Sequence, residues 1–444
     1  MPEPGEGDGE TAAGETSAGE TSTATLAVFL LVVAVAVWLR FWNLGSAGIS
    51  SSESGLCAAA ALEPGSALAR VPSLAPAVFR TIFALWEPVD TLAIGATALL
   101  GVATVVALFL AGRAAFGDAA ALAGAAALSA MELHVVASRQ AGNEVPIAFL
   151  SLAGVWTCGV ASRRKSFVPA FLGVLAIGAA AVALAQGISA PRPAGPPWSG
   201  VFVLRCLARW TSPLVLGAAL IGVAAALRRR SGSDRVLLAW AALSLLASVA
   251  LRPDPGSAVP VLPPLALLAG VGLEATSRLA APGWRRGRPA ALALLLLAPG
   301  ILGSSSAVDL EDRGYELASR FLAQGPRDPR PDVLALEPAI LFYLAGAGDG
   351  AHAWIDADAP AAIAALESGS FRYLVGDVRL ARAPALRGLI ERKAADLRAV
   401  AAIGNPLAGP TLAAAAGFDA VDDPREREEL TRIRVWRPLG PGRR

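Results

Sequence analysis

The stretch LRFWNLGSAGISSSESGLCAAAALEPG, residues 39 to 65, ends the first apolar run of the chain and opens a long connection. Trp42 stands where the apolar run ends, and a turn of small residues that carries one acid, Glu53, follows it. We therefore expect a membrane-embedded active site to begin at this loop, with the rest of the chain as its scaffold.

The composition is that of a membrane protein. Of the 444 residues, 55% are hydrophobic and 17% are charged, which lies outside the usual range of soluble domains. The formal net charge of +2 says little, because positive and negative residues are segregated along the chain. Nothing in this pattern indicates binding to nucleic acid.

Nine apolar runs approach the length of about 20 residues that a membrane span requires. Several are rich in Ala and Gly, which suits close packing of helices within a bundle. The predicted spans are residues 25–42, 90–112, 118–137, 144–162, 167–188, 210–227, 235–251, 257–275 and 288–306.

Basic residues gather in the connections that follow the second, fourth, sixth and eighth predicted spans. These connections share one side if the spans alternate, and the positive-inside rule places that side in the cytoplasm. We therefore expect a bacterial inner-membrane protein with a cytoplasmic N-terminus, an external first loop at 43–89 and an external tail after residue 306. The basic residues are Arg113, Arg163, Arg164, Lys165, Arg228, Arg229, Arg230, Arg235, Arg278, Arg285, Arg286 and Arg288.

Both ends of the chain differ from the apolar region, residues 25–306. Residues 1–24 carry six acids, no basic residue and little apolar sequence, which predicts a disordered cytoplasmic tail. From residue 307 to 444 the chain is charged and mixed, and β-like runs alternate with helical stretches. This alternation predicts a small α/β domain with a largely parallel sheet. The expected strands are residues 332–336, 371–376, 397–404 and 432–436.

Two local features qualify this division. Phe79, Ile82, Phe83 and Trp86 recur at helical spacing within residues 71–88, which predicts an interfacial helix in the first loop. Asp377 follows an expected strand, where α/β sheets can present a ligand group, and it is interpreted as a solvated loop acid.

Most predicted spans lack ionisable residues at their centres, whereas ion-coupled carriers keep such groups near the bilayer midplane. A solute carrier is therefore the least expected function. The polar groups collect at the external ends of the spans, which suits an enzyme whose lipid substrate lies in the outer leaflet. They are Glu53, Glu63, Arg70, Arg80, Glu132, His134, Arg139, Asn143, Glu144, Arg205, Arg209 and Arg252.

The first loop resembles that of the C-type glycosyltransferases, membrane enzymes that use lipid-phosphate sugars and include protein O-mannosyltransferases and aminoarabinose transferases. Arg40, Trp42, Asn43, Leu44, Gly45 and Glu53 carry the resemblance. The family has an Asp–Glu pair whose Asp is catalytic. Ser52 occupies the Asp position here, so Glu53 is the candidate catalytic carboxylate.

Two later stretches carry further resemblance. Ser138, Arg139 and Glu144 resemble the second external turn of the family, which implies that Arg139 and Glu144 position donor or acceptor. Residues 251–274 resemble a late turn in which Arg252 would bind the donor phosphate. Arg205 and Arg209, one helical turn apart, are alternative phosphate ligands.

The resemblance implies transfer of a sugar from a polyprenyl-phosphate donor to a hydroxyl of a glycan, lipid or protein at the outer face of the membrane. Such a transfer needs a carboxylate base and cations on the departing phosphate. The alternative is a catalytically inactive relative that binds lipid-linked glycan or partner proteins.

No cofactor is expected, and the external acids are too scattered to indicate a metal site. Cys57 and Cys206 fall in loops expected on the same side, which leaves a disulfide and buried thiols as alternatives.

Overall fold

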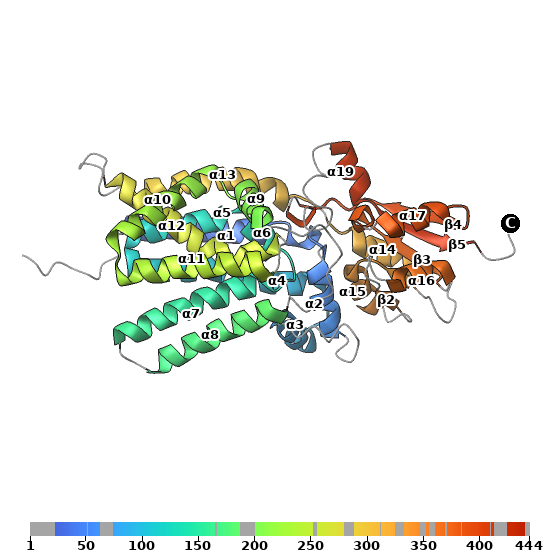
Figure 1. Cartoon of the computed structure of the whole chain (residues 1–444), viewed down its shortest axis with the longest axis horizontal. Helices are drawn as coiled ribbons and strands as arrows, with labels where there is room; N and C mark the ends of the chain where they lie inside the picture. Colours follow the sequence, from blue (N-terminus) through green and yellow to red (C-terminus); the bar gives the residue numbers. More distant parts are fainter. Residues whose placement is uncertain are drawn as a thin grey trace, which may run out of the picture.

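The chain forms a helical bundle joined at one end to an α/β part (Figure 1). The helices α2 (Ser52–Leu62), α3 (Leu74–Leu85) and α15 (Pro338–Gly346) lie where the two parts meet. The computed structural model describes residues 23–50, 52–62, 74–164, 167–186, 200–251, 255–278, 288–310, 312–324, 333–346, 352–354, 360–368, 371–382, 384–408, 410–412 and 424–439.

Each of the nine apolar stretches predicted as spans is helical over most of its described residues. Two pairs of consecutive helices are sharply bent, by 61° and 117°, and each pair is apolar enough to form one span. The described residues contain five candidate spans, or seven if each bent pair is one span, so the protein is a polytopic membrane protein. Nine crossings stay a prediction.

The five single spans are formed by α1 (Thr23–Phe41), α4 (Asp90–Phe116), α7 (Glu144–Arg164), α11 (Gly232–Leu251), and η3 (Gly256–Val261) with α12 (Leu262–Ser277). The bent pairs are α5 (Asp118–Ala130) with α6 (Glu132–Ser138), and α9 (Gly200–Trp210) with α10 (Pro213–Arg229). Three apolar segments are shorter: Leu74–Leu85, which is α3, Val168–Ala181 within α8 (Phe167–Gln186), and Ala290–Ser305 within α13 (Arg288–Val308).

Among the five single candidate spans, the one formed by η3 and α12 is the most buried, and most of the α12 side chains are buried. A Cβ atom added at Gly222 or Gly270 would overlap backbone atoms of a facing helix. These contacts join α12 to α10 and α5, and such close approach is typical of small residues in membrane bundles. Large apolar side chains elsewhere point outward; Leu220 on α10 and Leu302 on α13 are 71% and 78% exposed. Lipid is the solvent that suits this outer surface.

A five-stranded sheet has the order β2-β1-β3-β5-β4. Strands β1 and β2 and strands β1 and β3 pair parallel, whereas β5 pairs antiparallel with both β3 and β4. The expectation of a largely parallel sheet is therefore wrong, and the sheet is mixed, because sequence periodicity carries no information about strand direction. All four expected strands are present, and the short strand β2 was not expected.

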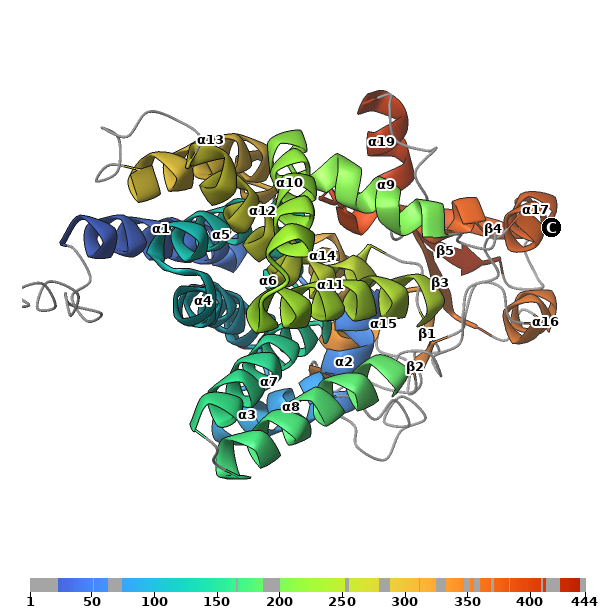
Figure 2. The ribbon, with the colours of Figure 1, turned by 60° about the vertical axis from the view of Figure 1, so that its left-hand side comes forward.

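The strands are β1 (Val333–Ala335), β2 (His352–Trp354), β3 (Tyr373–Gly376), β4 (Leu397–Ile403) and β5 (Ile433–Pro438). The helices around them are α14 (Gly314–Ala323), α15, α16 (Pro360–Ser368), η5 (Val378–Arg382), α17 (Pro384–Arg392) and α19 (Pro424–Thr431), and α16 and α17 stand at the right-hand edge of Figure 2.

Asp377 is buried, so its interpretation as a solvated loop acid is wrong. It accepts a hydrogen bond from the Tyr315 hydroxyl at 2.5 Å and pairs with Arg379 at 3.0 Å. Arg379 also pairs with Glu337, which is buried at the end of the neighbouring strand β1. Burial raises the pKa of Asp377. The acids that follow β1 and β3 thus form a closed ionic cluster within the α/β part.

Two other expectations have mixed outcomes. The helix expected at 71–88 is present as α3, and its aromatic residues are divided: Phe79 is buried, the Phe83 ring lies 6.1 Å from that of Phe342 on α15, and Trp86 is 60% exposed. Residues 1–22 of the predicted N-terminal tail lie outside the described residues. The domain limits at 24 and 306 stay predictions.

Candidate functional site

Arg40 of α1 stabilises the bend between α5 and α6, the helix that leads to Arg139. The buried Arg40 guanidinium donates to the Ser129 carbonyl at 2.9 Å and to Ser138 Oγ at 3.3 Å. It also donates to Nδ1 of His134 at 2.6 Å, since a guanidinium can only donate. Ser129 O is close to the C-terminus of α5, where the helix dipole favours a cation. The arginine of the first-loop motif therefore joins α1 to the bend.

Arg139 follows α6 and clamps the start of the first loop. Its Nη1 donates to the carbonyls of Trp42 at 2.7 Å and Arg40 at 3.3 Å. Its Nη2 donates to the carbonyls of Asn43 at 3.4 Å and Val308 at 3.3 Å. Asn43 has a left-handed backbone with φ of 51°, which Asn tolerates better than most residues. The Arg139 side chain thus fixes the turn between α1 and the loop.

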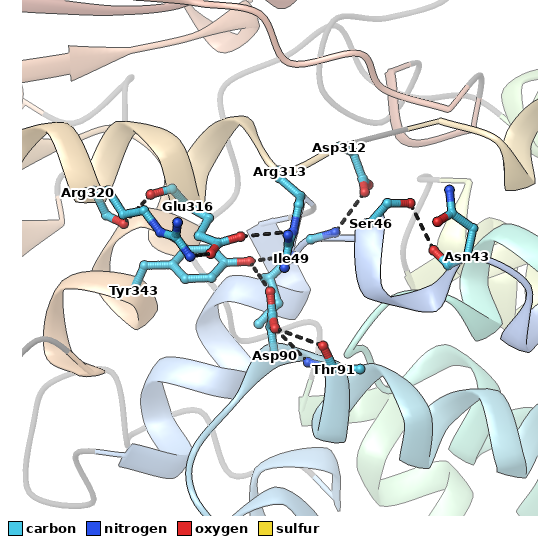
Figure 3. Close-up of polar contacts among 12 residues, drawn as sticks. Asn43, Ser46, Ile49, Asp90, Thr91, Asp312, Arg313, Glu316, Arg320 and Tyr343 are labelled. Carbon is cyan, nitrogen blue, oxygen red and sulfur yellow. Dashed lines mark hydrogen bonds and ion pairs between the residues drawn. The ribbon is translucent and has the colours of Figure 1, made fainter.

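Asp312, in the connection between α13 and α14, contacts the same loop further along. Its carboxylate accepts from the Gly48 amide at 2.8 Å and from Ser50 Oγ at 2.6 Å. Burial raises the pKa of Asp312 to about 6, against the hydrogen bonds from Ser50 and Gly48 and the charge of Arg139. Figure 3 shows this carboxylate facing the loop backbone that leads to Ile49.

Gln140 connects this loop to the first turn of α2. Its Nε2 donates to Ser50 Oγ at 2.8 Å, and its Oε1 accepts from Ser54 Oγ at 3.3 Å. Glu53 precedes Ser54 as the second residue of α2, and its side chain lies outside the described residues. Glu53 is therefore next to a residue, Ser54, that is hydrogen-bonded to Gln140 in the turn between α6 and α7.

Helix α2 also packs on α15. A Cβ atom at Gly55 would overlap the backbone of Ala339, so the two helices are in backbone contact. The Tyr343 hydroxyl of α15 accepts from the Ile49 amide at 3.0 Å and donates to Asp90 at 2.7 Å (Figure 3). The first loop, the start of α4 and the α/β part thus meet around α2.

Glu144 begins α7 directly after the second turn and is partly buried. A Cβ atom at Gly142 would overlap its carboxylate, so the side chain folds back over the turn. In the same turn, Asn143 donates to Cys57 Sγ on α2 at 3.3 Å. The structure therefore brings Arg139, Glu144 and the backbone of Glu53 together.

The predicted phosphate ligands lie elsewhere. Arg205 and Arg209 are exposed on α9, and Arg209 interacts electrostatically with Glu132 at the start of α6, as does Arg427 of α19. Glu132 and Arg139 bracket α6, a separation of roughly 10 Å for a helix of this length. Arg252 lies outside the described residues. Glu132 and the arginines near it thus lie at the start of α6, whereas Arg139 lies at its end.

Sequence reasoning missed several residues of this site. Asp312, Tyr343, Gln140 and Asp90 join segments far apart in the chain, and no local pattern marks them. Arg427 lies in a charged stretch that is typical of a solvent-exposed helix. Glu132, by contrast, was already expected among the polar groups at the external ends of the spans.

Cys57 and Cys206 are buried on α2 and α9, and neither forms a disulfide. Within the described ranges, no three His, Cys, Asp or Glu side chains are grouped closely enough to hold a metal ion.

The fold is similar to those of the aminoarabinose transferase ArnT and of an archaeal oligosaccharyltransferase, which are C-type glycosyltransferases, and the predicted resemblance is confirmed for the fold. The aminoarabinose transferase ArnT from Cupriavidus metallidurans in the apo state matches with a TM-score of 0.59 and 14% identity, over 93% of this chain and 98% of that one. ArnT bound to undecaprenyl phosphate matches with a TM-score of 0.58 and 15% identity, over 94% of this chain and 98% of that one.

The oligosaccharyltransferase from Archaeoglobus fulgidus in the apo form matches with a TM-score of 0.56 and 10% identity, over 80% of this chain and 70% of that one. No family model and no curated protein sequence matches the chain. The likeness therefore lies in the fold.

Proposed function

We propose that the protein transfers a sugar from a polyprenyl-phosphate donor to a hydroxyl acceptor at the end of the bundle that carries the α/β part. The observation that carries this proposal is the match to ArnT along nearly the whole of both chains, including ArnT bound to undecaprenyl phosphate. In this proposal the protein lies in a bacterial inner membrane with its α/β part outside.

Glu53 is the proposed general base. It is in the first turn of α2, where the helix dipole favours the ionised carboxylate that a base requires. Ser52 cannot replace it, because a serine hydroxyl is not a base at neutral pH. The hydrogen bond between Ser54 and Gln140 supports a fixed position for this turn.

Arg209 and Arg205 are the proposed ligands of the donor phosphate. Val203, Cys206 and Trp210 are buried on α9, whereas Arg205 and Arg209 are exposed, and Arg209 lies close enough to Glu132 to interact with it electrostatically. Guanidinium groups bind phosphate oxygens by two charge-assisted hydrogen bonds and can stabilise the leaving group.

The remaining predicted site residues have supporting parts in this proposal. Arg139 and Glu144 shape the turn against which α2 packs, so they position the base. Arg252 is proposed as a further phosphate ligand from its sequence resemblance.

Membranes containing the full chain test the proposal with undecaprenyl phosphate that carries a labelled hexose, hexosamine or amino-pentose. We expect the wild type to release free undecaprenyl phosphate. Release should be at least 100-fold slower in Glu53→Gln. Donor binding should be at least 10-fold weaker in Arg209→Ala. Glu391→Gln and Arg387→Ala are matched controls, since both side chains are 64% exposed and pair with each other on α17.

Wild-type protein that binds the donors without releasing the lipid phosphate would support the inactive alternative. Full activity in Glu53→Gln would overturn the assignment of the base. Ser52→Asp, which restores the acid of the family pattern, should raise the rate if the site is otherwise complete.

A further inference from the structure

Asp312 makes two hydrogen bonds to the segment that leads to Glu53. The side chain is 9% exposed, and each carboxylate oxygen accepts one bond, from the Gly48 amide or the Ser50 hydroxyl. The backbones also touch, because a Cβ atom at Gly48 would lie 2.6 Å from the Asp312 carbonyl oxygen. The connection between α13 and α14 therefore lies directly against the loop.

A chain of hydrogen bonds runs from Asp312 through Ser50 and Gln140 to Ser54 in the first turn of α2. Ser50 gives its one proton to Asp312 and accepts from the Gln140 amide, whose oxygen accepts from Ser54. The donor and acceptor roles are all determined when Asp312 is ionised, since an ionised carboxylate can only accept. Ser54 is the neighbour of Glu53, so this relay ends one residue from the proposed base.

A second contact supports the same segment from the α/β part. Gly55 packs against the backbone at the start of α15, and Ile49 donates to the Tyr343 hydroxyl of the same helix. Residues on both sides of Glu53 are thus held by elements more than 250 positions later in the chain.

We propose that Asp312 is a positioning residue that holds the Glu53 turn of α2 against the Gln140 turn. This proposal rests on the proposed transfer function. Asp312 is buried with both oxygens occupied, so it acts through Ser50 and Gln140 and does not contact substrate. Its removal should slow the chemical step and spare donor binding, for which α9 supplies the proposed arginines.

The substitutions Asp312→Ala and Asp312→Asn test the proposal in a graded way. Ala removes both hydrogen bonds. Asn keeps an acceptor oxygen for the Gly48 amide, but its NH2 group faces the Ser50 hydroxyl, which must then accept instead of donate. Asp309→Ala is the matched control, because Asp309 is exposed three residues earlier and has no hydrogen bond to residues 47–50 or 52–55 in the described structure.

The first measurement is hydrogen–deuterium exchange of the full chain in nanodiscs. We expect roughly 10- to 100-fold faster exchange of peptides within residues 43–62 in Asp312→Ala, a smaller increase in Asp312→Asn and unchanged exchange in α12. Exchange in 43–62 at the wild-type rate would overturn the proposal. Faster exchange throughout the bundle would also overturn it, since Asp312 would then be a general stability residue.

The second measurement is donor turnover. We expect kcat to fall at least 10-fold in Asp312→Ala with KM for the donor within twofold of wild type, and partial rescue in Asp312→Asn. A rise in KM with unchanged kcat would overturn the positioning role. If Asp312→Ala does not fold, Ser50→Ala and Gln140→Ala interrupt the same relay and should give the same pattern.

The two proposals fail in distinguishable ways. Absence of turnover in the wild type overturns the transfer function. The exchange experiment still decides whether Asp312 holds the Glu53 turn, because it needs no substrate.

Discussion

The hydroxyl of Tyr343 donates to the carboxylate of Asp90 at 2.7 Å, and these two residues are 253 positions apart in the sequence. The same hydroxyl accepts from the Ile49 amide, so one oxygen joins the first loop, α4 and α15. Burial raises the pKa of Tyr343, which keeps the hydroxyl protonated and able to donate. This oxygen therefore joins α15 of the α/β part to two segments of the bundle end.

Tyr343→Phe should therefore destabilise this contact. It leaves the Ile49 amide and one Asp90 oxygen without this partner, at a cost of about 1–3 kcal/mol. Thermal unfolding in detergent measures the loss as a lower midpoint. Tyr373→Phe is the control, because its hydroxyl makes no hydrogen bond to any described residue, and an equal loss in both variants would contradict the assignment.

Asp312 should make stability depend on pH. Its pKa is about 6 in the folded protein and about 4 when unfolded, so the folded state binds the proton more tightly. The stabilisation is complete below pH 4 and is lost as the pH rises through 6, by about 2–3 kcal/mol. The unfolding midpoint of wild type should fall from pH 4 to 7 relative to that of Asp312→Asn. Parallel pH profiles for the two proteins would contradict this prediction.

Gly55→Ala should separate α2 from α15. The added methyl group would overlap the backbone of Ala339, and backbone cannot move aside as cheaply as a flexible side chain. We expect a loss of about 1–3 kcal/mol and faster proteolysis between bundle and sheet. Gly217→Ala on α10 is the control, since no atom lies within 4 Å of its added Cβ, and it should be neutral or slightly stabilising.

Arg40→Met should impair folding of the bundle. It leaves the Ser129 carbonyl and His134 without their donor inside the bend between α5 and α6. A loss of about 3 kcal/mol or more is expected for an interrupted buried network. The yield of monodisperse protein after detergent extraction is the measurement. Arg228→Met, at an exposed position of α10, should retain the wild-type yield, and equal yields for both would contradict a special role for Arg40.

The sequence determined the elements of this protein. Runs of about 20 apolar residues have few alternatives to helix in a bilayer, because every backbone polar group must be satisfied within the segment. The strands around Leu334, Leu374 and Val435 were likewise predicted from their apolar residues. The first-loop motif led to Arg40 and Glu53, and the comparison with solved structures confirmed the fold that the motif indicated.

Only the tertiary structure decided what surrounds Glu53. Asp312 and Tyr343 belong to stretches whose local pattern is that of any charged loop or short helix, and their roles arise from hydrogen bonds to residues more than 250 positions earlier. Strand direction in the sheet and the burial of Asp377 were decided in the same way. Local periodicity reports which face of an element is apolar, whereas the partner of a buried polar group is set by the packing of distant elements.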